Sequence, residues 1–219
     1  MLDATGPSEG GRIRIGGAFQ GGKPGSTDST HAARFGANES STALAASTTT
    51  SVDAASVIDV SATGDDGRGG SVVLWSDTNT RMDGTLRATG AASGGAVEIS
   101  SAEQVQSLAL DRLELSRDGL LLIDPKNIWI TVGGLEPYSW LYEPDHDTVL
   151  DSDQLVGLLS SGVDISLVAS NDLSWFASDV PLVQVSRPAP NMPAGNLDLI
   201  AGRSVTLEGV FETGGGTWN

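Results

Sequence analysis

The sequence predicts an all-β fold, a parallel β-solenoid, on the strength of short strands, alternating apolar residues and a repeating glycine signal. Glycine precedes strand-like segments again and again, and Gly70, Gly95 and Gly119 begin three of them, 25 and 24 residues apart. A period of this length suits one coil of a solenoid and is too short for a propeller blade. An antiparallel sandwich with similar strand spacing is the alternative, although sandwiches seldom repeat both a motif and its offset.

A second strand signal follows the first at a fixed offset. Gly70 and Gly84 are 14 residues apart, and so are Gly195 and Gly209. Apolar residues alternate along these strands, as strands with one buried face require. One coil cannot bury its apolar face alone, so we expect the inward residues of neighbouring coils to stack.

The alternation assigns each strand residue to one of two faces. The predicted inward residues are Val72, Leu74, Val97, Ile99, Leu121, Ile123, Leu197 and Leu199. The predicted outward residues, mostly polar and expected to face solvent, include Arg14, Val73, Glu98 and Asp198.

Two segments interrupt the coils. Residues 21–55 are rich in Ser, Thr and Ala and have few inward candidates, which predicts a long loop extending from one coil. Residues 133–162 are aromatic and acidic and form a predicted insertion between coils at 1–132 and coils at 163–219. Helical spacing of leucines, a capping residue and a glycine stop predict a short helix within the insertion. The residues concerned are Ser152, Asp153, Leu155, Leu158, Leu159 and Gly162.

The composition limits the classes of function. Twelve basic against 28 acidic side chains give a net charge of −16, which disfavours nucleic acid and anionic membranes as partners. The absence of cysteine excludes disulfides, Cys-ligated zinc and thiol catalysis. No apolar run approaches the roughly 20 residues of a spanning helix, so no membrane insertion is expected. Residues 1–7 carry no secretory signal, and we expect both ends to be cut from a longer protein.

Five motifs in the sequence are distinctive as a combination. They are Gly16-Gly17-Ala18-Phe19-Gln20-Gly21, Gly67-Arg68-Gly69-Gly70-Ser71-Val72-Val73-Leu74-Trp75-Ser76-Asp77, Thr80-Arg81-Met82-Asp83-Gly84, Gly94-Gly95-Ala96-Val97-Glu98-Ile99-Ser100 and Leu120-Leu121-Leu122-Ile123-Asp124-Pro125-Lys126-Asn127-Ile128. Together they resemble the filamentous-haemagglutinin-like exoproteins, the large secreted adhesins of Gram-negative two-partner secretion. The resemblance is strong over residues 10–130 and looser over 150–214.

The resemblance implies a right-handed parallel β-helix in a secreted or cell-surface adhesin, acting in attachment or as its rod-like shaft. It also implies export through an outer-membrane pore transporter, and a glycan or protein of the host-cell surface as partner. A passive spacer that presents a distal toxin or receptor-binding tip is the alternative. A β-helical polysaccharide-degrading enzyme is a third.

The sequence predicts no enzyme, no catalytic residue, no metal and no cofactor, because the acidic residues scatter over turns and insertions. Asp145-His146-Asp147 is the best isolated candidate for a metal, but one His and two Asp do not complete a ligand shell. Tyr138, Trp140 and Tyr142 are the candidate ligand-binding residues, since aromatic side chains on a projecting loop suit recognition. The alternative is that these rings fold back and cap an apolar face of the coils.

Overall fold

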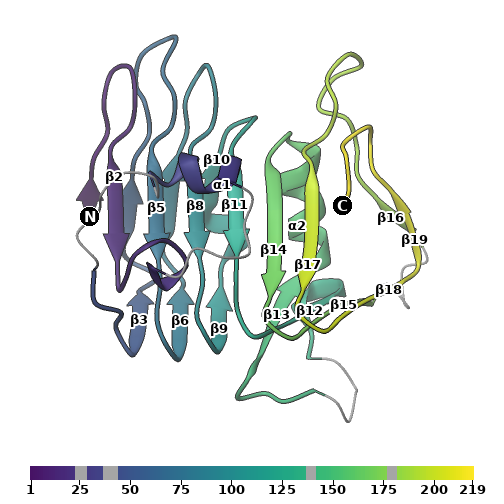
Figure 1. Ribbon diagram of the computed structural model, residues 1–219. Coiled ribbons are helices and arrows are strands. Elements are labelled where there is room, and N and C mark those ends of the chain that lie inside the picture. Colours follow the sequence, from purple (N-terminus) through teal and green to yellow (C-terminus); the bar gives the residue numbers. More distant parts are fainter. Residues whose placement is uncertain (23–28, 37–43, 137–141, 177–181) are drawn as a thin grey trace.

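The computed structural model describes residues 1–22, 29–36, 44–136, 142–176 and 182–219. In this part of the chain strands predominate over helices, and every pairing between named strands is parallel (Figure 1). The predicted all-β class is therefore confirmed, and the strands do not form an antiparallel sandwich. No helix among the described residues is long and apolar enough to cross a membrane.

The strands of the described residues form five sheets. The six-stranded sheet contains β2 (Arg12–Ile15), β5 (Ser71–Leu74), β8 (Ala96–Ile99), β11 (Leu120–Ile123), β14 (Asp164–Ala169) and β17 (Leu197–Ala201). One four-stranded sheet contains β1 (Leu2–Asp3), β4 (Val57–Asp59), β7 (Thr85–Ala88) and β10 (Leu113–Leu115). The other contains β13 (Asp147–Asp151), β12 (Asn127–Thr131), β15 (Asp172–Phe176) and β18 (Ser204–Glu208). Two smaller sheets contain β3 (Thr49–Val52), β6 (Asn79–Met82) and β9 (Gln104–Leu108), and β16 (Leu182–Gln184) and β19 (Val210–Glu212).

From β2 to β11 the chain visits three sheets in turn and then returns to the first. After β5, strand β6 joins the three-stranded sheet, β7 joins a four-stranded sheet, and β8 comes back beside β5. Each return keeps the register, because Val97 lies opposite both Val72 and Leu121 on the neighbouring strands. Such a path is consistent with the parallel β-helix that the glycine period predicts.

The main core lies between the sheets and is built from the inward residues. Seven of the eight predicted inward residues are buried, and the eighth, Leu199, is partly buried against the same cluster. Side chains of one strand lie in register with those of the next, as in the column of Val72, Val97, Leu121 and Ile165. The prediction of stacked apolar columns is confirmed for these strands.

Glycine is required where the backbones of successive turns lie close together, before β2, β5 and β8. The Gly70 amide donates to the Val60 carbonyl at 2.8 Å, and the Gly95 amide donates to the Ala88 carbonyl at the same distance. A Cβ atom added to Gly70 would overlap the backbone oxygen of Gly11, and one added to Gly95 would overlap the backbone oxygen of Gly70. These glycines are needed for space and not for a positive φ.

A second apolar cluster covers the outer face of the six-stranded sheet. The short helices η1 (Phe19–Gly22) and α1 (Ser29–Arg34) lie over this face (Figure 1). The Phe19 and Phe35 rings stack with centroids 4.8 Å apart. We call this segment, the described part of residues 17–36, the cover. The apolar residues beneath it are Val73, Trp75, Ala96, Leu120, Leu122 and Val168.

The cover corrects two predictions. Residues 21–55 are not one extended loop, because they include α1 and the strand β3. Val73 and Glu98 are buried and do not face solvent, since the cover packs on that face. Alternation along a strand distinguishes its two faces but does not show whether a distant segment covers the outer one.

The predicted helix of the insertion is α2 (Ser152–Ser160). The Asp151 side chain caps it by accepting from the Asp153 amide, and Gly162 follows its end with a φ of 88°. Leu155 and Leu159 are fully buried in the main core. The insertion also contributes β13, which pairs with β12 and which the sequence did not predict.

Replacing Gly70 with Ala tests the close approach of the coils. The added methyl group overlaps backbone, so we expect Gly70→Ala to lower the free energy of unfolding by about 2 kcal/mol. Gly157, in the exposed part of α2 with nothing within 4 Å of an added Cβ, is the matched control. Gly157→Ala should raise the free energy of unfolding by up to about 1 kcal/mol. Urea unfolding followed by circular dichroism measures both changes, and equal effects would contradict the packing argument.

Candidate functional site

A groove of about 740 Å³ lies on the outer face of the sheet formed by β12, β15 and β18. It combines aromatic, charged and hydroxyl side chains on the surface of stacked strands. The described residues that line it are Lys126, Asn127, Trp129, Glu143, Asp147, Asn171, Asp172, Ser174, Phe176, Arg203, Ser204, Thr206 and Glu208. We call it the aromatic groove.

Strand geometry places the aromatic rings on this face. Ile128 and Ile130 point inward to the main core, so Trp129 between them points outward. On β15 the inward residues are Leu173 and Trp175, which leaves Phe176 on the outer face. The Trp129 and Phe176 rings stack with centroids 5.3 Å apart and planes 19° from parallel.

Asp147 holds the Trp129 ring in position. Its carboxylate is buried and accepts from Trp129 Nε1 at 2.8 Å, from the Glu143 amide at 2.7 Å and from Asn127 Nδ2 at 2.7 Å. Three donors on one buried carboxylate leave little capacity for a metal or a proton transfer. Asp147 is therefore a positioning residue that ties β13 to β12 and to the segment before it.

Charged pairs border the groove. Arg203 donates from Nε to Asp172 Oδ1 at 2.8 Å and from Nη2 to Asp172 Oδ2, a bidentate pair that lowers the pKa of Asp172. Lys126 Nζ lies 3.0 Å from Glu103 Oε2. Trp129 is only 8% exposed and supports the partly exposed Phe176 ring from behind. The groove thus offers an aromatic ring in its floor and hydrogen-bonding groups at its edge, a combination suited to a sugar or a polar peptide.

Of the three predicted ligand-binding residues, only Tyr142 can be placed. Tyr138 and Trp140 lie outside the described residues. The Tyr142 ring meets Trp129 edge-on with centroids 6.2 Å apart. Trp129 and Phe176 were not among the predicted site residues, although each is a large apolar residue at an outward position, and that signal could have identified them.

The predicted metal candidate does not gather ligands. His146 Nδ1 lies 3.7 Å from Glu103, and the Asp147 carboxylate faces Trp129. Within the described ranges no group of three or more His, Cys, Asp or Glu side chains could hold a metal ion.

A second cluster, which sequence reasoning missed, lies beneath the cover. Glu98 is fully buried, and its two carboxyl oxygens accept from the Gln20 amide at 3.0 and 3.3 Å. The Gln20 side chain donates from Nε2 to Asp124 Oδ2 at 3.0 Å. Gln20 takes left-handed backbone angles, φ 48° and ψ 39°, an unfavourable conformation for a residue with a side chain. The two carboxyl groups thus fix the cover on the sheet.

Burial perturbs both carboxyl groups. It raises the pKa of Glu98 to about 8, with a further contribution from the neighbouring Asp124, while the hydrogen bond from the Gln20 amide opposes the shift. Burial also raises the pKa of Asp124 to about 6. Glu98 is therefore largely protonated at neutral pH, and ionising it beneath the cover is costly.

Comparisons with known proteins identify no relative. No protein-family model matches the sequence, and no curated protein matches it either.

Replacing Glu98 with Gln tests the buried carboxyl group. Folded Glu98 holds its proton up to about pH 8, whereas the unfolded chain releases it near pH 4.5. At Glu98 the folded state thus binds more protons between these values, so this group's contribution to the free energy of unfolding falls as the pH rises from 4.5 to 8. In Glu98→Gln we expect the free energy of unfolding to stop falling with pH above about pH 6. Below that value the raised pKa of Asp124 should still make it fall as the pH rises.

Urea unfolding at intervals between pH 4.5 and pH 8.5 measures this slope. Glu114→Gln, on an exposed strand residue, removes the same charge and should leave the slope nearly as in the wild type. An unchanged slope in Glu98→Gln would show that Glu98 is ionised when folded, contrary to the expectation.

Proposed function

We propose that this chain is a non-enzymatic segment of a large secreted surface adhesin, folded as a right-handed parallel β-helix. Its stacked sheets form a rod-like shaft, and the aromatic groove contacts a glycan or protein of the host-cell surface. The observation that carries the attachment role is the aromatic groove, with Trp129 and Phe176 stacked on the outer face of a sheet.

The open inner face of the last strands supports the shaft. Val205 and Leu207 lie in register with the buried Leu173 and Trp175, yet they are 44% and 47% exposed. A further coil stacked on β18 would bury them and continue the apolar columns. A shaft lengthens by such additions, because each coil needs only its neighbours for stability.

The export partner and the location rest on the family resemblance of the sequence motifs. We propose passage through an outer-membrane pore transporter and a secreted or cell-surface destination. The acidic composition, with a net charge of −16, suits a soluble surface filament.

The buried carboxyl groups Glu98 and Asp147 are not placed for hydrolysis. Polysaccharide hydrolysis uses a pair of carboxyl groups that flank an accessible sugar. Glu98 is fully buried under the cover, and Asp147 is buried and already accepts three hydrogen bonds. The passive spacer remains the second candidate. The open inner face of β18 favours it, because a shaft built by stacking on that face needs no ligand.

Groove variants test the attachment role. We expect the chain to bind host cells or a glycan array, and Phe176→Ala to weaken binding about tenfold through loss of a ring from the groove floor. Thr206→Gln, which places a larger side chain in the groove, should have a similar effect. Thr49→Gln, at an exposed threonine on β3, is the control and should bind as the wild type does.

Three results would contradict the proposal. A folded wild-type chain that binds neither cells nor glycans would be a spacer. Binding that neither groove variant changes would place the contact elsewhere. Release of reducing ends from a polysaccharide would indicate an enzyme.

A further inference from the structure

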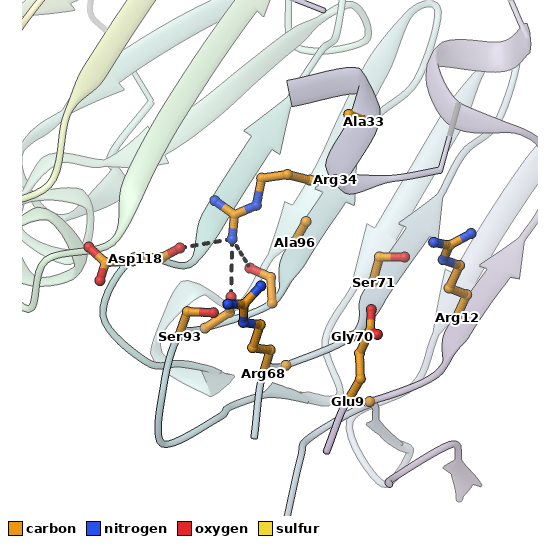
Figure 2. A pocket seen from close by; sticks show the side chains of 14 residues that line it. Glu9, Arg12, Ala33, Arg34, Arg68, Gly70, Ser71, Ser93, Ala96 and Asp118 are labelled. Atoms are coloured by element: carbon orange, nitrogen blue, oxygen red, sulfur yellow. Dashed lines mark hydrogen bonds between the residues drawn. The ribbon is translucent and has the colours of Figure 1, made fainter. Parts of the chain in front are cut away.

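A second and smaller cavity, of about 300 Å³, lies between α1 and the glycine turns that precede β2, β5 and β8 (Figure 2). Backbone of the turns at Gly10, Gly70 and Gly95 forms one wall, and Ala33 and Arg34 of α1 form another. Ser71 and Ser93 add hydroxyl groups to the lining. We call it the arginine pocket, and it is separate in its lining residues from the aromatic groove.

The pocket concentrates positive charge in a strongly acidic chain. Arg12, Arg34 and Arg68 all line it, which is three of the twelve basic side chains of a protein with 28 acidic ones. These residues come from three separate segments, and Figure 2 shows Arg34 and Arg68 approaching the pocket from opposite sides. Backbone folding, and no local sequence motif, brings them together.

Hydrogen bonds through one nitrogen, Nη2, hold the guanidinium group of Arg34 in one orientation. Its Nη2 donates to the carbonyl oxygens of Gly94, Gly95 and Asp118 at 3.0, 3.3 and 2.8 Å. Its Nε and Nη1 have no hydrogen-bond acceptor among the described residues. Partial burial lowers the pKa of Arg34, and the nearby carboxylates of Asp164 and Asp118 oppose this shift only in part. A bound anion would compensate this loss of hydration.

Arg68 is fixed by its backbone and not by an ion pair. Its main chain bridges to Glu9 on one side and to Ser93 on the other, and both are turns of neighbouring coils. Its side chain is exposed, and within the described part of the chain it forms no ion pair. In a chain this acidic, a guanidinium group that lines a cavity without a carboxylate partner is available for an external anion.

The two acidic residues of the lining set the charge that the pocket can accept. The Asp118 carboxylate lies 3.4 Å from Arg117 Nε and is thereby partly neutralised. Glu9 is exposed and opposes an anion directly. Acidic residues thus offset part of the positive charge of Arg34 and Arg68, so a ligand group with a single negative charge suits the pocket better than one with two.

We propose that the arginine pocket binds the monoanionic oxyanion group of an acidic sugar, a carboxylate or a sulfate ester, between Arg34 and Arg68. Guanidinium groups suit this chemistry because they donate two parallel hydrogen bonds to one oxyanion. The sugar hydroxyls would meet Ser71, Ser93 and the backbone of the turns. The inference rests on the proposed function for its setting, a surface glycan, but it uses a different surface from the aromatic groove.

Calorimetric titration of the full chain with glucuronate, glucose 6-sulfate and glucose at low salt tests the proposal. We expect saturable binding of at least one acidic sugar and none of glucose. Arg68→Gln should weaken binding roughly tenfold or more, because a charge-assisted hydrogen-bonded pair is lost. Glu9→Gln should strengthen it, since the opposing carboxylate is removed. Arg81→Gln, an exposed strand residue outside the pocket, removes the same charge as Arg68→Gln and should leave affinity unchanged.

The outcomes distinguish a carboxylate from a sulfate ester as the ligand group, and they test the arginine pocket separately from the aromatic groove. Binding of glucuronate alone identifies a carboxylate, and binding of the sulfate alone identifies a sulfate ester. Failure of both to bind the folded chain, equal binding of glucose, or binding insensitive to Arg68→Gln would overturn the inference. Attachment to cells that depends on Phe176 would survive such a failure, and binding of an acidic sugar would likewise survive a failure of cell attachment.

Discussion

Every surface described here depends on neighbouring parallel strands and the turns before them keeping their backbones at hydrogen-bonding distance. The glycine turns permit this spacing, because at Gly70 and Gly95 the backbone of the next coil occupies the place of a side chain. The spacing in turn keeps the inward residues in register, so that each apolar side chain packs on its equivalent above and below. The same register holds on the outer faces of the sheets, where it places residues that are far apart in the sequence side by side.

Residues whose environment is set by adjacent coils could be predicted from the sequence. The inward columns followed from alternation and from the glycine period, and α2 followed from its leucine spacing and its glycine stop. The cover could not be predicted in this way, because the surface on which it packs is made by four strands, β5, β8, β11 and β14, that come later in the chain. Val73 and Glu98 mark the surface that the cover hides. One is apolar and the other acidic, both are at outward positions of their strands, and both are buried.

The aromatic groove and the arginine pocket were predictable to a smaller degree, because distant segments form them too. Aromatic composition drew attention to the insertion, whereas the rings that stack are Trp129 and Phe176, on separate strands whose pairing no local pattern reveals. The arginine pocket is more extreme, since α1, the start of β2 and the turn before β5 each contribute one guanidinium group. Residues of this kind are identified only once the order of the strands is known.

The cover also has a consequence for the order in which the chain folds. Gln20 contacts Glu98 and Asp124, residues 78 and 104 positions further along. Contacts of such sequence separation close large loops and form late. In a chain made from its N-terminus, the cover emerges before β5, β8 and β11 exist to receive it. It can dock only when those strands have paired, so the segment synthesised among the first is one of the last to reach its final position.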